Sequence, residues 1–165
     1  TYFLRFFSRR CYVRKILILF FLFFVAQLGM SIAEDKEKSV LKTILPLEGQ
    51  CNTLLISDTP FPCKGLVMQS NYDDDKMGFY FAAEDGKTII TFSGYPSDNG
   101  EQSLTVLDLY VVIISEKLIN VKGGCVFEDL FSGVAKIQCV AKDDNGAFYR
   151  SDFLSDGQRP EYIEF

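Results

Sequence analysis

Phenylalanine and aliphatic residues fill every second position on one side of GFYFAAEDGKTIITF, residues 78–92, with Asp85-Gly86 near the centre, and the positions between them are mixed. A period of two predicts strands with one buried face, and Asp-Gly between two such runs predicts a two-residue hairpin loop of type I′. One face then carries the pairs Phe79–Phe92, Phe81–Ile90 and Ala83–Thr88. The other carries Tyr80–Thr91, Ala82–Ile89 and the opposite charges Glu84–Lys87. The segment therefore predicts an antiparallel hairpin with one apolar face.

A second hairpin is predicted around DDNG, residues 143–146, where more than one loop length fits. A two-residue loop would set Cys139 against Asp152 and would mix apolar and charged residues on one face. A three-residue loop ending in left-handed Gly146 separates the two faces. It gives the inward pairs Ile137–Phe153, Cys139–Ser151 and Ala141–Tyr149, and the outward pairs Gln138–Asp152 and Val140–Arg150.

The strand before this hairpin extends the same register. A loop at Phe131-Ser132-Gly133 sets Cys125 opposite Cys139, with Phe127–Ile137 on the same face and the charge pair Glu128–Lys136 on the other. A close cross-strand cysteine pair has the separation that a disulfide requires. Residues 124–154 are therefore predicted to form a three-stranded meander joined by a Cys125–Cys139 disulfide.

Between the hairpins, SLTVLDLYVVII at 103–114 is apolar at both alternating positions, which predicts a central strand covered on both faces. Six or more short strands within 51–165 predict an all-β domain, either a small antiparallel barrel or a sandwich. Residues 34–50 are charged as far as Lys42 and contain Pro46 and Gly49 beyond it. They are predicted to form a linker or first turn.

The first 33 residues have the pattern of an export signal. The apolar run Ile16–Leu28 follows five basic residues, Arg5, Arg9, Arg10, Arg14 and Lys15. A run of about 13 residues fits a signal helix and is shorter than the roughly 20 that span a bilayer. Ser31-Ile32-Ala33 provides small residues for cleavage between Ala33 and Glu34. The alternative is an uncleaved anchor in an inner membrane through residues 16–33.

Cleavage would change the charge of the protein. The whole chain has 17 Lys and Arg against 22 Asp and Glu, a net charge of −5. Removal of residues 1–33 takes five cations and no anion, so 12 cations remain against 22 anions and the net charge becomes −10. An acidic surface disfavours nucleic acid and anionic lipid. Acidity alone usually indicates only solubility, and the alternative interpretation is a basic protein partner.

Four cysteines remain in the exported part: Cys51, Cys63, Cys125 and Cys139. An even count in an exported domain predicts two disulfides, for which three connectivities are possible. The register above favours the local pairs Cys51–Cys63 and Cys125–Cys139. A four-cysteine zinc site fits poorly, because spacings of 12 and 14 residues differ from the close pairs of structural zinc sites.

The chain contains no histidine, which excludes Ser-His-Asp and Cys-His catalysis and histidine-ligated metals. Asn71–Asp75 is similar to a calcium loop, but Lys76 and Ala82 replace the glycine and glutamate that an EF-hand needs. A solvated turn is favoured, and a loose cation site at Asp73 and Asp75 stays open. No catalytic residue, cofactor or metal is predicted.

Three segments carry a resemblance: CNTLLISDTPFPCKGLVMQSNYDDDKMGFYF, TFSG and IQCVAKDDNGAFYRSDFLSDG. Together they resemble small exported proteins of alphaproteobacteria over most of residues 50–160. The resemblance implies the periplasm or cell envelope and supplies no active-site residues. Periplasmic lysozyme inhibitors match only in architecture and acidity, because Ser93-Gly94 lacks the tyrosine that their Ser-Gly-x-x-Tyr signature requires three residues after the glycine.

We therefore expect a non-enzymatic, periplasmic or secreted β domain that binds a protein partner or has a structural role. Two alternatives remain at this point. One is a lipocalin-like carrier of a small apolar ligand, and the other is a lysozyme-inhibitor-like binder of a basic protein.

Overall fold

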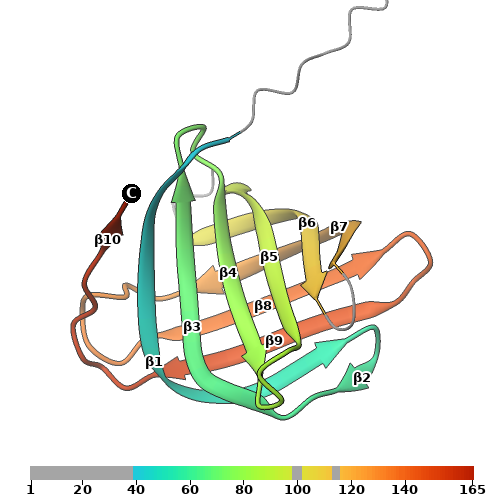
Figure 1. The fold of residues 1–165 in the computed structure, drawn as a ribbon, viewed down its shortest axis with the longest axis horizontal. Helices are drawn as coiled ribbons and strands as arrows, with labels where there is room; N and C mark the ends of the chain where they lie inside the picture. Colours follow the sequence, from blue (N-terminus) through green and yellow to red (C-terminus); the bar gives the residue numbers. More distant parts are fainter. Residues whose placement is uncertain (1–38, 98–101, 113–115) are drawn as a thin grey trace, which may run out of the picture. The chain divides into compact units, whose positions relative to one another are not determined.

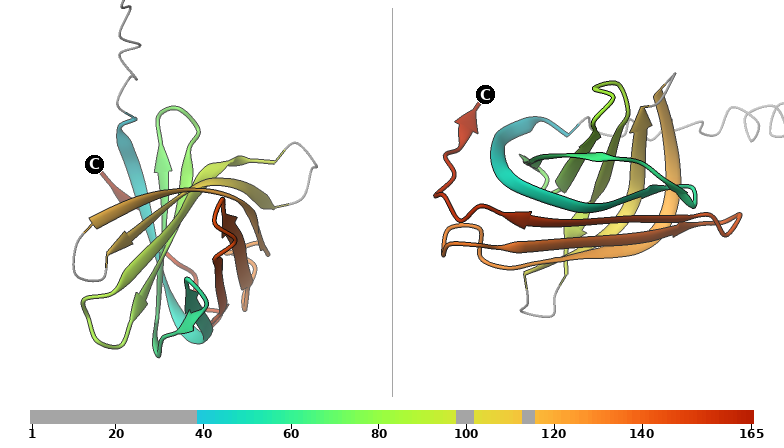
Figure 2. Two further views of the ribbon diagram at one scale, coloured as in Figure 1. Left: turned by 90° about the vertical axis from the view of Figure 1, so that its right-hand side faces the viewer. Right: turned by 90° about the horizontal axis from the view of Figure 1, so that it is seen from below.

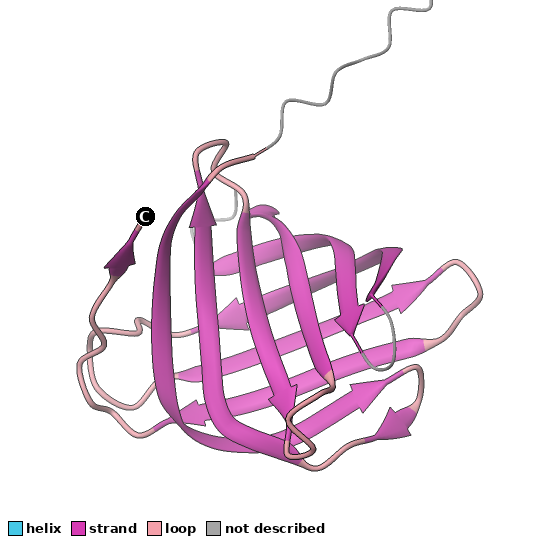
Figure 3. Cartoon of the chain, in the orientation of Figure 1, coloured by secondary structure: helices cyan, strands magenta, loops and turns pink. Residues whose placement is uncertain are grey.

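The computed structural model describes residues 39–97, 102–112 and 116–165, all in strands, turns and loops. The ten strands are β1 (Leu41–Ile56), β2 (Thr59–Pro60), β3 (Cys63–Tyr72), β4 (Met77–Ala83), β5 (Ile89–Pro96), β6 (Ser103–Val112), β7 (Glu116–Phe127), β8 (Lys136–Asp143), β9 (Phe148–Ser155) and β10 (Ile163–Glu164) (Figure 3). Across these ranges no helix is long and apolar enough to cross a membrane.

Eight of the strands form a closed antiparallel barrel. The order is β1-β3-β4-β5-β6-β7-β8-β9, and β9 pairs back with β1. In Figure 1 β1, β3, β4 and β5 run in front of β7, β8 and β9 at a steep angle, and Figure 2 shows the same wall from two further sides. The all-β antiparallel prediction is confirmed, and the architecture is a barrel. The predicted signal helix and the Ala33–Glu34 cleavage site lie outside the described residues.

Strand β1 closes the barrel by bending. Its residues Leu41–Glu48 pair with β3, and its residues Gly49–Leu55 pair with β9. At the bend, a Cβ on Gly49 would lie 2.1 Å from the carbonyl oxygen of Leu154, so only glycine fits. The prediction of a linker through residue 50 is therefore wrong for residues 41–50. Pro46 and Gly49 mark an edge and a bend within a strand.

The first hairpin has the predicted register, with Phe79 opposite Phe92 and Phe81 opposite Ile90. Its turn differs from the prediction, because Gly86 has a positive φ but Asp85 does not, whereas type I′ needs both. The Asp85 carboxylate instead accepts hydrogen bonds from the backbone N–H groups of Lys87 and Thr88, both at 2.8 Å. A side-chain acceptor thus replaces the second left-handed residue.

The meander predicted over residues 124–154 is present as β7-β8-β9 with the expected registers, including Cys125 opposite Cys139. Gly146 has a φ of 88° and its N–H donates to the Asp143 carbonyl, as the three-residue loop requires. The β7–β8 loop is longer than predicted, because Ala135, just before β8, exchanges hydrogen bonds with Ser155 of β9 and not with β7. The register survives since Glu128 still pairs with Lys136.

Strand β6 is central but is not covered on both faces. Leu109 and Val111 are buried inside the barrel, whereas Leu107 is 47% exposed on the outside. The apolar residues on the inner face of this strand therefore belong to the core, whereas those on its outer face belong to the surface of the barrel.

The core occupies the barrel interior. Its largest fully buried side chains are Phe79, Phe81, Phe92, Phe153, Leu45, Leu54, Ile90, Leu104, Leu109, Ile137, Val67 and Val106. Phe81 and Phe92 meet edge to face at 5.8 Å, and Phe79 meets Phe127 at 5.1 Å. Each of these geometries is favourable for aromatic pairs.

Candidate binding surfaces

The four predicted cysteines form the two predicted pairs. Cys51 and Cys63 join the second half of β1 to the start of β3, with a Cα separation of 5.7 Å. Cys125 and Cys139 join β7 to β8 inside the barrel, with a Cα separation of 4.0 Å. Each bond cross-links two strands of the barrel wall, and both bonds favour an oxidising, exported environment.

The acidic segment at residues 73–75 is a structural turn between β3 and β4. Asp73 Oδ1 accepts from the Val40 N–H at 2.9 Å, and Asp74 Oδ2 accepts from Ser39 Oγ at 2.7 Å. Among the described residues, no group of three or more Cys, Asp or Glu is arranged to hold a metal ion. The carboxylates at this turn hold the start of β1 against the barrel end.

The outer wall over β3–β6 differs from an ordinary solvated sheet face. Outward positions of a sheet usually carry charged side chains. Here Ser70, Ser93 and Asp108 face outward at one end, and the outward positions beside them carry mostly tyrosines and aliphatic residues. We call this surface the tyrosine face, and it comprises Met68, Tyr72, Tyr80, Ala82, Ile89, Thr91, Tyr110 and, on β7, Leu118. Leu118 is 67% exposed and lies opposite Tyr110.

Hydrogen bonds fix the tyrosine rings on this face. The hydroxyls of Tyr72 and Tyr80 are 3.0 Å apart, and Tyr110 bonds to Glu116. Burial, with a further contribution from Tyr72, raises the pKa of Tyr80 to about 12. The hydrogen bond to Glu116 raises the pKa of Tyr110 in the same direction. These hydrogen bonds hold the three rings in place.

Thr91 lies under these rings. It pairs across the strands with Tyr80 on one side and Tyr110 on the other, and it is 2% exposed. Its hydroxyl has no hydrogen-bond partner in the structure, which is costly for a buried polar group. The tyrosines therefore cover an outward residue that a bare sheet face would leave in water.

A depression adjoins the tyrosine face at the barrel end. Its volume is about 480 Å³, and it is lined by Asn71, Tyr72, Asp74, Asp75, Lys76, Met77, Tyr95 and Pro96. Tyr95 Oη donates to Asp74 Oδ2 at 3.2 Å, and the bond from Ser39 is the main cause of the lowered pKa of Asp74. Lys76 is turned toward Asp108, with Nζ 3.2 Å from Oδ2. We call this the rim depression.

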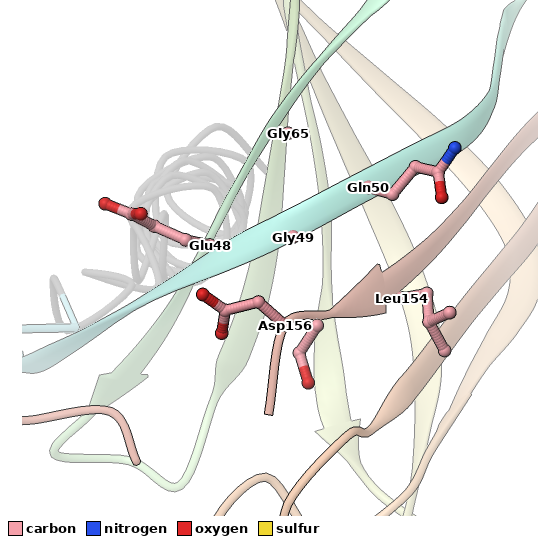
Figure 4. A pocket seen from close by; sticks show the side chains of 7 residues that line it. Glu48, Gly49, Gln50, Gly65, Leu154 and Asp156 are labelled. Atoms are coloured by element: carbon pink, nitrogen blue, oxygen red, sulfur yellow. The ribbon is translucent and has the colours of Figure 1, made fainter. Parts of the chain in front are cut away.

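A second hollow follows β1 where it bends. It has a volume of about 410 Å³ and is lined by Glu48, Gly49, Gln50, Gly65, Leu154, Ser155 and Asp156. Figure 4 shows Glu48 and Asp156 at one end and Gln50 and Leu154 at the other, with bare backbone at Gly49 between them. A smaller hollow of about 180 Å³ shares Glu48, Ser155 and Asp156 and continues past Pro46 to Pro160. We call the two together the edge groove.

Glu48 and Asp156, the two carboxylates where the hollows of the edge groove meet, are both exposed. The barrel interior is also closely packed around the aromatic core, since its twelve largest fully buried side chains are each less than 2% exposed. A side chain that lined a ligand cavity would keep accessible surface, so these residues leave no such cavity between them.

Comparison with protein-family models, with curated proteins and with solved structures finds no match to this chain.

Sequence reasoning placed the cysteines but did not identify the surfaces. The pairing of Tyr80 with Thr91 was a usable signal, because the outward positions of that hairpin were aromatic and small. Tyr72 and Tyr110 join them only through the strand order. The edge groove had no local signal, since Gly49, Gly65 and Asp156 meet through tertiary structure.

Proposed function

We propose that this protein is an exported, non-enzymatic β-barrel that binds a basic protein partner through its tyrosine face. The observation that carries the proposal is the composition of that face: tyrosine and aliphatic side chains on the outside of a wall whose interior is already filled. Tyrosine is enriched at protein interfaces, where it supplies a large contact area with few rotatable bonds.

The hydrogen bonds of the rings support this role. Tyr72 and Tyr80 are held by the bond between their hydroxyls, and Tyr110 is held by Glu116, so little side-chain freedom is left to lose when a partner docks. The Thr91 hydroxyl beneath them is unpaired and offers one further polar contact if the rings shift.

The acidic rim supports a basic partner. Asp74 and Asp75 line the rim depression together with Tyr72 and Tyr95, and carboxylates beside aromatic rings form a favourable surrounding for a lysine or arginine side chain. Lys76 is neutralised there by Asp108. The net charge of the chain, −5, has the same sign as the carboxylates of the rim depression, and would steer a basic protein toward this protein.

The proposed site of action is the periplasm or the extracellular space. The two disulfides support an oxidising environment, and the apolar segment before residue 33 supports export. A lysozyme-like enzyme is one basic protein of the cell envelope environment that fits this description. The lipocalin-like carrier receives no support from the packed interior.

The test uses two matched substitutions of exposed aliphatic residues on the outer wall. Leu118→Lys places a cation on the tyrosine face, and Val140→Lys places one on β8, away from it. Each immobilised full-length variant is exposed to an envelope extract and, separately, to purified lysozyme. Bound proteins are identified by mass spectrometry, and lysozyme affinity is measured by calorimetry.

The expected result is enrichment of one or a few basic proteins by the unsubstituted chain and by Val140→Lys, with a loss of at least about tenfold in affinity for Leu118→Lys, corresponding to roughly 1.4 kcal/mol. If no protein is enriched, or if both variants lose binding equally, the tyrosine face is not the binding surface.

A further inference from the structure

The edge of β1 that faces away from β3 is closed by two different segments. Along Gly49–Leu55 this edge pairs with β9, and along Thr43–Ile44 it pairs with β10. The Glu48 carbonyl accepts from the Asp156 N–H, and the Lys42 carbonyl accepts from the Phe165 N–H. By the alternation of an antiparallel ladder, Pro46 faces the same edge and has no N–H to donate. The wall is therefore completed there only by the C-terminal segment.

We call residues 156–165 the strap. All of its residues from Glu161 to Phe165 are exposed, including Ile163 at 51% and Phe165 at 74%. Its contacts beyond the edge include a ring contact between Tyr162 and Phe131, with centroids 5.5 Å apart. None of its residues belongs to the buried core. A segment that buries so little can be released while the core stays intact.

The edge groove lies directly beside the strap. Its two hollows meet at Glu48 and Asp156, at the point where the strap leaves β9, and its smaller hollow is bounded by strap residues Gln158, Arg159 and Pro160. The connection contains Gly157 with a φ of 80° and Pro160, which cannot donate a backbone hydrogen bond. The strap is therefore attached through a short turn and not through a packed element.

We propose that the edge of β1 from Lys42 to Glu48 is a strand-acceptor site, and that its occupant in trans is the strap of a second copy of this chain. The argument for this occupant is that the strap already seats on the edge in cis, with Ile163 on Ile44 and Glu164 on Thr43. The same backbone and side-chain complementarity is available to an identical strap from another molecule. Exchange in both directions gives a closed, two-fold dimer, which is the domain-swapping route to oligomers. This proposal does not depend on the tyrosine face.

The test uses cysteine pairs that report which molecule supplies the strap. Two full-length variants, Ile44→Cys and Ile163→Cys, are made in a Cys11→Ser background, so that each introduced thiol is the one cysteine outside the two disulfides. The variants carry different tags and are mixed, incubated to allow exchange, and oxidised in air. Because residues 44 and 163 are direct cross-strand partners, a disulfide between the two variants forms efficiently only when the strap of one rests on β1 of the other.

Val126→Cys is the control partner, since Val126 is 58% exposed on the outer face of β7 and is not on the β1 edge. We expect several-fold more mixed disulfide between Ile44→Cys and Ile163→Cys than between Ile44→Cys and Val126→Cys. The doubly substituted chain, with both residues 44 and 163 as cysteine, should close its own disulfide and stay monomeric, which verifies the register and the fold. Equal mixed disulfide in the test and control mixtures, with that self-closed monomer present, would overturn the second copy as the occupant.

Discussion

Asp152 is the one charged side chain in the buried class among the residues that the structure describes, at 7% exposure. It lies on the outer face of β9 and accepts from Gln138 Nε2 and from Arg150 Nε, both at 2.7 Å. Burial by itself would raise the pKa of this carboxyl, but the hydrogen bonds from Arg150 and Gln138 outweigh burial and lower the pKa. The ionised form is therefore favoured in the folded protein.

We predict that Asp152→Asn lowers the free energy of unfolding by about 1 kcal/mol at neutral pH, because it replaces a charged acceptor of two hydrogen bonds. A lowered folded pKa stabilises the protein above the pKa of the unfolded chain, and the effect is lost as pH falls through the folded value. The difference between wild type and variant should therefore shrink in acid. Urea unfolding at several pH values measures it.

Asp144→Asn is the control for that series, since Asp144 is exposed in the β8–β9 turn and the substitution removes the same charge. A constant difference for Asp152→Asn from neutral pH into acid, or an equal effect at Asp144, would contradict the role of the Arg150 and Gln138 contacts.

The Tyr72–Tyr80 pair gives a prediction at the opposite end of the pH scale. Burial and the Tyr72 hydroxyl raise the pKa of Tyr80 from 10.0 to about 12. A raised folded pKa stabilises the protein below pH 10, and this contribution is lost as pH rises toward 12. We predict that Tyr72→Phe lowers the pKa of Tyr80, because the hydroxyl that contributes to the shift is removed.

A difference titration of phenolate absorbance measures this change, with Tyr162→Phe as the control at a half-exposed ring. If the two variants differ from wild type only by the loss of one titrating tyrosine each, the hydroxyl contact does not contribute to the shift.

Among the elements, β1 depends most on a single position. A Cβ at Gly49 would meet the Leu154 carbonyl oxygen at 2.1 Å and the Ser155 Cα at 2.7 Å, and neither atom belongs to a flexible side chain. We predict that Gly49→Ala destabilises the protein by about 3 kcal/mol or more, because the backbone of β1 or β9 must move. Chemical denaturation gives the value.

Gly124→Ala is the matched control, because a Cβ there has its nearest contact at 3.3 Å, to the Leu104 carbonyl oxygen, and Gly124 is also within a strand. The control should cost less than about 1 kcal/mol. Similar losses for both variants would mean that the close approach of β1 and β9 does not decide the result.

The two disulfides allow a comparison at almost constant loop length, since their sequence separations are 12 and 14 residues. The chain-entropy contribution is about 3 kcal/mol for each bond. Cys125 and Cys139 are both fully buried, whereas Cys51 and Cys63 are half-buried. We predict that replacing Cys125 and Cys139 by alanine destabilises the protein by about 1 kcal/mol more than replacing Cys51 and Cys63 does, because loss of the buried pair also leaves a cavity.

Thermal and denaturant unfolding of the two double variants provides the comparison. Equal losses would indicate that chain entropy alone accounts for both bonds, and that the packing of the Cys125–Cys139 pair adds nothing.

On the scale of the whole molecule, local signals predicted the strand pairs and could not predict the closure. The registers at Asp85-Gly86 and around Cys139 follow from alternation and turn residues, which are properties of adjacent segments. The turns themselves were less predictable. A type I′ turn was expected at Asp85-Gly86, but Asp85 has no positive φ, and two consecutive residues with positive φ occur instead at Ser57 and Asp58. Side-chain acceptors such as the Asp85 carboxylate can stabilise several turn types.

The choice of a barrel over a sandwich depended on β1. Its first half was interpreted as a linker because Pro46 and Gly49 usually end a strand. In the barrel Pro46 faces an edge where no ladder partner needs its N–H, and Gly49 permits contact with β9. Both roles exist only once β9 and the strap are in place, about 100 residues later in the chain. The same holds for the edge groove, which is formed by these distant segments.

The closure of β1 on β9 has a consequence for how the chain folds. Apart from the pairings that bring β9 and β10 to β1, and the β1–β3 pairing, which passes over the two-residue β2, every pairing among the described strands joins neighbours along the chain. Such local hairpins close short loops and can form early, whereas a contact between Gly49 and Ser155 closes a loop of about 100 residues and is slow. For a chain that emerges N-terminus first during synthesis, the barrel cannot be sealed until residue 155 has emerged. Until then the edge of β1 that later pairs with β9 is unpaired, and a chaperone that covered this edge would have its largest effect during that interval.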